Sequence, residues 1–412
     1  MKSATMMVLC AVVCGIPSVA IAERPALEIS TADTFCNGLK SAVAGQLAGT
    51  DPVFIRSYQP GLDEAELPDG LKSTAFVYDN ALAVIALIAC GDLPRAKAIG
   101  DALSSAARSD RTFQDGRIRN AYRAGPVEHP PNLPGWWDGR AKIWAEDPAQ
   151  NGTSTGNVAW AALALLTLHE AARDGQYLAD ARRLVDWIIA NTSCGDNGFC
   201  GGFHGYDPQQ VRLAWSSTEH NADVSAATTW LFRLTKQQKY ADAAAHARSL
   251  IDRAFREDHF LLGTKPDGSA ADEGLLALDV QIWPWMACSD APLPWRRALG
   301  FAESHMAVDG GFDFNGDRDG VWVEGTAQVA LAYRINGNAS AGDQLVRTLE
   351  PDKTASGFLN ATRSPRLTTG LSIDPTGSIP NFFYYRRPHL GATAWAALAA
   401  TGWNPFTGQK VH

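Results

Sequence analysis

Four acidic residues open segments of the chain that otherwise carry almost no charge. They are Asp79, Glu219, Asp279 and Glu324, and each precedes a run rich in apolar residues. Two carboxyl groups in one site can act as proton donor and proton acceptor when their surroundings give them different pKa values. We therefore predict acid–base chemistry with Glu219 as the donor, Asp79 or Glu324 as the acceptor, and Asp279 as a further catalytic candidate.

A structural role would also explain these residues. Acidic side chains favour the first turn of a helix, where they cap backbone N–H groups and interact with the helix dipole. Ser216 and Glu219 have the spacing of a capping box, which fixes a helix start. Capping does not require four such residues to meet, so the catalytic hypothesis depends on a fold that brings them together.

Other polar and aromatic side chains stand near the same segment starts and in the stretches before them. Aromatic faces with hydrogen-bonding groups beside them suit a sugar ring, although isolated aromatics also anchor loops in small hydrophobic clusters. We expect substrate-binding roles for Tyr78, Trp136, Trp137, Asn157, Trp215, His220, Asn221, Asp223, Gln281, Tyr385, Arg387 and His389.

The elements that must position these residues are helices of two kinds. One kind is amphipathic and charged, and the other is apolar all round after a polar first turn, which is typical of a helix inside a protein. Six of each kind alternate strictly along the chain. The amphipathic segments are 30–48, 92–108, 175–191, 238–256, 292–306 and 339–350, and the apolar ones begin near residues 78, 155, 219, 279, 324 and 389.

This alternation predicts an all-α fold in which six helical hairpins close into a ring, an (α/α)6 toroid. The apolar helices form the inner layer. An open solenoid would show a sequence repeat of fixed length, and the chain has none. Links from inner to outer helices are short, whereas links from outer to inner helices are long, at 109–154, 192–216, 257–277, 307–322 and 351–387. The long loops share the face where the inner helices begin, so that face is the expected active face.

Hairpin number, alternation and polar inner-helix starts resemble the six-hairpin glycosidase superfamily over about residues 30–405. The resemblance implies a glycoside hydrolase or a polysaccharide lyase with its site at the inner-helix N-termini. No motif of a particular family is recognised, so no catalytic residue is carried over. We expect a hydrolase that cleaves a poly- or oligosaccharide with two carboxyl groups, without a cofactor and as a monomer.

Two alternatives remain open at this stage. A polysaccharide lyase would use Tyr78 or His220 as its base, and would neutralise a uronate with Asn157, Asn221 or an arginine. A non-catalytic glycan-binding protein would keep the toroid without turnover. The arginines that the long loops offer to a lyase are Arg117, Arg119, Arg123, Arg386 and Arg387.

The stretch 313–320 resembles a calcium-binding loop, with Glu324 at its twelfth position. Arg318 replaces the glycine that such loops require, so an acidic turn is the favoured interpretation and no metal is predicted. If calcium did bind, Glu324 would be a ligand instead of a catalyst.

Residues 1–22 have the pattern of a cleaved secretory signal, which leaves a single catalytic domain at 23–412 and implies a periplasmic or secreted protein. Export favours a disulfide between Cys194 and Cys200, and Cys36 with Cys90 is a candidate second pair that would leave Cys288 as a buried thiol. The formal net charge of −8 disfavours nucleic acid as a partner, and the mature chain has no apolar span of membrane length.

Overall fold

The computed structural model describes Met1 and residues 30–411, except for residues 48, 50, 61–66, 272–273 and 375–376. Apart from Met1, the predicted signal segment lies outside the described residues. None of the described helices combines the length and the apolar character that a membrane crossing needs.

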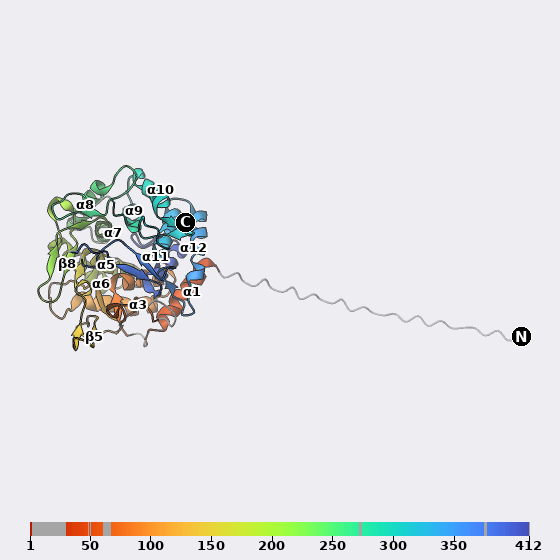
Figure 1. The fold of residues 1–412 in the computed structure, drawn as a ribbon, viewed down its shortest axis with the longest axis horizontal. Helices are drawn as coiled ribbons and strands as arrows, with labels where there is room; N and C mark the ends of the chain where they lie inside the picture. The colour runs from red at the N-terminus through yellow and green to blue at the C-terminus, as the bar shows by residue number, and fades with distance from the viewer. Residues whose placement is uncertain are drawn as a thin grey trace.

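In the described part of the chain, twelve helices form two concentric layers (Figure 1). Each of the first five inner helices packs on the outer helix that follows it, and α13 packs on α1; each inner helix also packs on two inner neighbours, and α13 packs against α2 to close the ring. The predicted (α/α)6 toroid is confirmed. The inner helices are α2 (Val77–Ala89), α5 (Thr155–Ala172), α7 (Thr218–Thr235), α9 (Leu278–Ala287), α11 (Val323–Ile335) and α13 (Leu390–Thr401). The outer helices are α1 (Thr31–Ala44), α3 (Leu93–Arg108), α6 (Gly175–Asn191), α8 (Gln238–Ala254), α10 (Arg297–Met306) and α12 (Ala339–Arg347).

The two layers follow from the two kinds of sequence. All residues of α13 from Leu390 to Ala400 are buried, as expected for a helix surrounded by others. In contrast, α6 buries one face through residues such as Tyr177, Leu184 and Trp187. Because small residues dominate α13, its neighbours α2 and α11 can approach it closely.

Aromatic rings fill the axis of the toroid. The rings of Trp160, Trp283 and Trp395 come from three inner helices, and their centroids lie 5.3–6.0 Å apart. Phe406 closes the cluster, with its ring 5.1 Å from Trp160 and 5.5 Å from Trp283. The ring is therefore a packed core and not a channel.

Short strands lead from the long loops into the inner helices. β2 (Thr74–Phe76) precedes α2, β7 (Thr153–Ser154) precedes α5, β10 (Ser216–Ser217) precedes α7, and β17 (Pro388–His389) precedes α13. Their antiparallel partners are β3 (Ala121–Arg123), β8 (Gly202–His204), β11 (Gly263–Thr264) and β14 (Leu359–Asn360). These pairs hold the loops on the face where the inner helices begin.

Two disulfides are present, as the sequence indicated. Cys36 on α1 is bonded to Cys90 at the end of α2, and Cys194 is bonded to Cys200. Cys288 is a buried free thiol. The first bond matters for ring closure, because α1 is the outer partner of the last inner helix, α13.

The two disulfides should differ in their contribution to stability. The Cys36–Cys90 bond spans 54 residues of sequence, and the Cys194–Cys200 bond spans 6. Loop-closure entropy then predicts a loss of about 4 kcal/mol for Cys36→Ala/Cys90→Ala and about 2 kcal/mol for Cys194→Ala/Cys200→Ala. Urea unfolding of both double variants checks this order, and equal losses would contradict it.

Candidate active site

The deepest part of the site joins three inner helices at their N-termini. The Tyr78 hydroxyl donates a 2.6 Å hydrogen bond to Glu324 Oε1, and Trp395 Nε1 donates to the Tyr78 oxygen at 2.8 Å. Asp79 Oδ2 lies 3.4 Å from His389 Nε2, and Glu324 Oε2 lies 3.9 Å from His389 Nδ1. Asp79, Glu324 and His389 are all buried.

His389 also caps the helix that it precedes. Its Nδ1 accepts a hydrogen bond from the backbone N–H of Ala392 at 3.2 Å, which directs an Nε2–H group towards Asp79. Burial alone would lower the pKa of His389, but the Asp79 carboxylate outweighs burial and the pKa is raised. The Nε2–H group of the imidazole therefore faces the Asp79 carboxyl group.

The surroundings of Glu324 favour the neutral, protonated form of its carboxyl group. Burial, with help from the charges of Asp79 and Asp279, raises the pKa of Glu324 to about 8, although His389 and the Tyr78 hydrogen bond act against the rise. The Glu324 carboxyl group is therefore mostly protonated at neutral pH. Its Oε2 atom is buried without a hydrogen-bond partner among the described residues.

A second group of carboxyls comes from α7 and α9. Burial raises the pKa of Glu219 well above its usual range, and the charges of Asp279 and Glu324 raise it further. Burial also raises the pKa of Asp279 to about 6 and that of Asp223 well above its usual value. Glu219 is half-buried, whereas Asp223 is buried completely. The electrostatic coupling shows that acidic side chains from four inner helices converge.

The start of α7 differs from the prediction in a way that bears on Glu219. The N-cap residue is Ser217, whose hydroxyl accepts the backbone N–H of His220 at 3.3 Å. The predicted capping box of Ser216 with Glu219 is therefore wrong, because the helix begins one residue later. Since the cap does not use the Glu219 carboxyl group, capping does not account for its presence.

Two glycines allow the close approach of these side chains. A Cβ atom on Gly391 of α13 would lie 2.6 Å from Asp79 Oδ1 and 2.8 Å from Glu324 Oε2. A Cβ atom on Gly156 of α5 would lie 2.5 Å from the His220 ring and 3.1 Å from Asp223 Oδ2. The lack of a side chain at these two positions on α5 and α13 thus leaves room for the acidic residues of the neighbouring helices.

Aromatic residues of the last long loop complete the site. The Tyr384 ring packs 5.3 Å from Trp322 and 6.2 Å from His389. Burial raises its pKa, and the charges of Glu324, Asp279 and Asp79 contribute, which places its hydroxyl among these carboxyls. Tyr384 stands beside Tyr385 in the sequence, but only Tyr385 was among the predicted site residues. No helical period marks a loop residue that tertiary folding carries into a site.

Loops from opposite sides of the ring meet on this face. His204 belongs to β8 before α7, and Asp374 belongs to the loop before α13, which stands three helices away around the ring. His204 Nε2 lies 3.7 Å from Asp374 Oδ1. The two loops therefore meet across the face that carries the carboxyl groups.

Three of the predicted substrate-binding residues make hydrogen bonds within the protein. The Asn221 amide accepts the N–H of Phe199 at 2.9 Å and donates to its carbonyl at 2.9 Å, and Gln281 makes the same pair of bonds with Phe260 at 2.8 and 2.9 Å. Asn221 and Gln281 are completely buried. Asn157 is half-buried and donates to the Asn120 side chain at 2.8 Å. The polar side-chain atoms of Asn221 and Gln281 thus hold the backbone of the preceding loop, and their substrate-binding role stays a prediction.

The remaining candidates lie at different depths. Trp215 and His220 are half-buried with their rings 5.7 Å apart, and burial lowers the pKa of His220 to about 4. Tyr385 is half-buried with its ring 6.3 Å from Tyr58, and Arg387 is buried. Trp136 and Trp137 lie in a hairpin at the edge of this face, with Trp137 strongly exposed.

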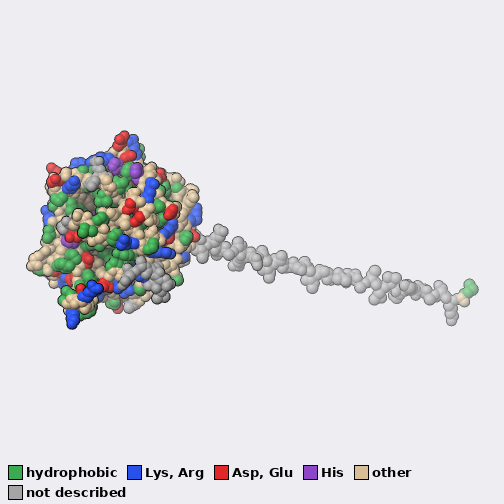
Figure 2. Space-filling view, in the orientation of Figure 1, with side chains coloured by type: hydrophobic (Ala, Val, Ile, Leu, Met, Phe, Trp, Pro, Cys, Tyr) green, Lys and Arg blue, Asp and Glu red, His purple; other side chains and the backbone are tan. Residues whose placement is uncertain are grey.

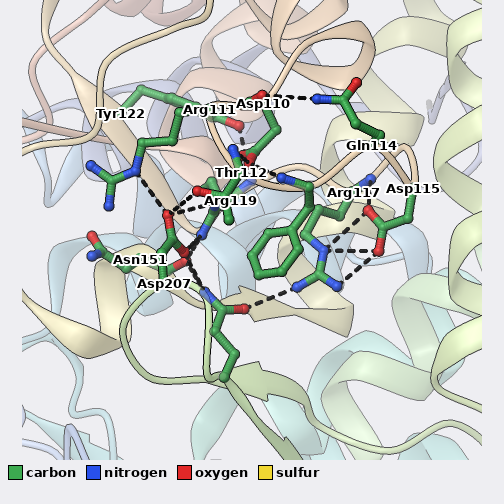
Figure 3. A network of polar contacts seen from close by, with 12 residues as sticks. Asp110, Arg111, Thr112, Gln114, Asp115, Arg117, Arg119, Tyr122, Asn151 and Asp207 are labelled. Atoms are coloured by element: carbon green, nitrogen blue, oxygen red, sulfur yellow. Dashed lines mark hydrogen bonds and ion pairs between the residues drawn. The ribbon is translucent and has the colours of Figure 1, made fainter.

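Two arginines that a lyase would need are engaged in ion pairs (Figure 3). Arg119 is completely buried, with its guanidinium group 2.7 Å from Asp110 Oδ1 and 2.7 Å from Asp207 Oδ1. Arg117 bonds to Asp115 at 2.8 Å and stacks on Phe113. This network ties the loop before α5 to the loop before α7, so Arg117 and Arg119 are structural residues.

The acidic loop at 313–320 is separate from this site. One carboxylate oxygen from each of Asp313, Asp317 and Asp319 lies within 4.8 Å of the other two. Asp313 and Asp319 accept backbone N–H groups, and Arg318 takes the left-handed conformation at φ 58° where a calcium loop has glycine. Glu324 instead lies with Asp79 and His389. One potential ligand atom from each of these three residues lies within 4.8 Å of the other two, which is also a spacing that could hold a cation.

No family model matches the sequence, and no curated protein matches it either. Solved structures do share the fold. A wild-type glycosidase aligns at 12% identity over 90% of this chain and 96% of its own, with a TM-score of 0.59. A protein described as a novel α-amylase from Clostridium perfringens aligns at 10% identity over 89% and 97%, with a TM-score of 0.61. A family 76 α-mannanase from Bacteroides thetaiotaomicron aligns at 13% identity over 90% and 95%, with a TM-score of 0.55. The chain therefore shares the (α/α)6 fold of these solved structures.

The site has no room for a methyl group at Gly391. Gly391→Ala should push Asp79 and Glu324 apart and lower stability by about 1–3 kcal/mol, measured by urea unfolding. Gly300→Ala in α10 is the matched control, because a Cβ atom there meets nothing within 4 Å and should stabilise the helix by up to about 1 kcal/mol. Equal effects of the two substitutions would contradict this packing.

The raised pKa of Glu324 makes its contribution to stability depend on pH. The folded state holds this proton more tightly than the unfolded chain, so the contribution is complete below pH 4.5 and is lost as the pH rises through about 8. Relative to the unaltered protein, Glu324→Gln should therefore gain unfolding free energy between these pH values. The exposed Glu128→Gln is the control. A difference independent of pH for Glu324→Gln would contradict the burial argument.

Proposed function

We propose that this protein is a glycoside hydrolase that acts on a poly- or oligosaccharide. The observation that carries the proposal is the convergence of carboxyl groups from four inner helices at the N-termini of those helices. Glycosidic bond cleavage requires one carboxyl group that is protonated and one that is ionised. The fold shared with glycosidases and an α-mannanase supports the same class of reaction.

Glu219 is the proposed proton donor. Burial raises its pKa well above the usual value, which favours the protonated form, and its half-buried position leaves it accessible from outside. A donor of this kind protonates the leaving oxygen of the sugar bond. The helix cap is supplied by Ser217, so the Glu219 carboxyl group is not needed as a cap.

Asp79 is the proposed proton acceptor. Of the two acceptors that the sequence offered, Glu324 is mostly protonated at neutral pH, whereas Asp79 has the Nε2–H group of His389 beside it. Glu324 then positions Tyr78 through their 2.6 Å hydrogen bond. Asp279, with a pKa of about 6, is the rival acceptor that variants must test.

The wider biological setting is also part of the proposal. We infer a mature domain of residues 23–412 that functions as a monomer in the periplasm or outside the cell, after removal of residues 1–22. The two disulfides support an oxidising compartment. The chemistry assigned to Glu219 and Asp79 uses side chains only.

A polysaccharide lyase is the second candidate. The chain offers Tyr78 as a base, but Tyr78 donates its hydroxyl hydrogen to Glu324, and its pKa is raised well above the usual value by burial and by the Glu324 charge. Arg117 and Arg119 are already paired with Asp115, Asp110 and Asp207. These contacts favour hydrolysis.

Substitution of the two proposed catalytic groups tests the mechanism. Glu219→Gln and Asp79→Asn should each lower kcat by about 10²–10⁴-fold while circular dichroism and thermal unfolding show a folded protein. Asp279→Asn should have a smaller effect, and Glu128→Gln should have none. Reducing ends are measured on starch, mannan and uronate-containing polysaccharides, together with the ultraviolet absorbance of unsaturated sugars. Full activity of Glu219→Gln, or unsaturated products, would contradict the assignment.

A further inference from the structure

A two-stranded hairpin with exposed tryptophans projects from the active face. β5 (Trp136–Asp138) pairs with β6 (Ile143–Ala145), and Trp137 stands directly opposite Trp144. Trp137 is 61% exposed and Trp144 is 49% exposed. The hairpin extends from the body at the lower edge of Figure 1, where Figure 2 shows hydrophobic and basic side chains together.

The root of this hairpin is fixed to the strand that enters the catalytic helix α2. The Ser73 hydroxyl donates to the Gly135 carbonyl at 3.2 Å, and the Trp136 ring packs against Gly70. β2 follows Ser73 and leads directly to Tyr78 and Asp79. The hairpin is therefore held in a set position relative to the carboxyl groups, although neither exposed tryptophan contacts them.

The two exposed rings lie on one face of the hairpin, and a neighbouring side chain contacts one of them. Opposite residues of an antiparallel pair place their side chains on the same face of the hairpin, so Trp137 and Trp144 share one face. The guanidinium group of Arg123, which is itself exposed, lies 5.1 Å from the centre of the Trp144 ring and holds that ring by a cation–π contact. Trp136, in the adjacent position, faces the other way and anchors the root.

We propose that Trp137 and Trp144 form a platform that binds a glycan chain at sugar units beyond those held by the catalytic carboxyls. The apolar face of a sugar ring matches an exposed indole, and two adjacent indoles match successive units of a chain. The connection from the platform to β2 and α2 argues for a glycan in preference to another protein. The inference rests on the proposed function and adds that the natural substrate is a polymer.

Binding and turnover are tested separately, so that failure of one does not hide the other. Binding is measured by affinity electrophoresis in the Glu219→Gln background, with soluble starch, yeast α-mannan and polygalacturonate as the probes. Trp137→Ala/Trp144→Ala should weaken binding of the recognised polymer by about tenfold. In the active protein, the same change should raise KM for that polymer about tenfold and leave kcat and the cleavage of a trisaccharide unchanged.

Leu293→Ala is the matched control. Leu293 is 77% exposed, but it follows the C-terminus of α9 and so lies on the opposite face of the toroid. It should leave polymer binding unchanged, and thermal unfolding of all variants confirms that they are folded.

Three outcomes would overturn the platform. They are unchanged polymer binding in the double variant, an equal loss of activity on the trisaccharide and the polymer, and no binding of any of the three polymers by the unaltered protein. A dimer that dissociates when both tryptophans are replaced, seen by analytical ultracentrifugation without a change in glycan binding, would assign the surface to a second copy of the chain. Polymer binding that depends on the tryptophans, without turnover of any glycan, would retain the platform and reject the hydrolase.

Discussion

Closure of the ring by six apolar helices is the constraint on which the rest of the structure depends. Once α13 packs against α2, the N-termini of the inner helices must meet around one axis. The acidic residues of their first turns are then removed from water together, and burial is the largest cause of the raised pKa of Glu219, Asp279 and Glu324. The same packing that stabilises the fold thus creates the acid–base properties of the site.

Ring closure also determines how the long loops are held. Their backbone groups approach a buried surface and must find partners there, and inner-helix amides such as Asn80, Asn221 and Gln281 each bond to both the N–H and the carbonyl of one loop residue. A polar residue at an inner-helix start therefore either supports a loop or faces the cluster of carboxyl groups. The first role uses all of its polar atoms, whereas Glu324 Oε2 in the cluster is buried without a hydrogen-bond partner among the described residues.

This distinction separates what the sequence could predict from what it could not. The alternation of amphipathic and apolar segments predicted the fold, its inner and outer layers and the face that carries the long loops, because helical periodicity records which side of a helix is buried. It could not separate Asn221 from Glu219, which stand two residues apart on one helix. It also could not reveal the ion pairs of two arginines. Arg117 pairs with an aspartate of its own loop, and Arg119 pairs with one aspartate of its own loop and one of a distant loop.

By itself, the sequence determined the toroid, the two disulfides and the set of acidic residues at the helix starts, since each depends on local pattern or on residue type. Only the tertiary structure decided that His389 lies beside Asp79, that Tyr78 bonds to Glu324 and that Tyr384 comes from a loop to join them. These contacts join residues up to about 300 positions apart, and their electrostatics depend on burial and on distances of a few ångströms. No spacing along the chain encodes either quantity.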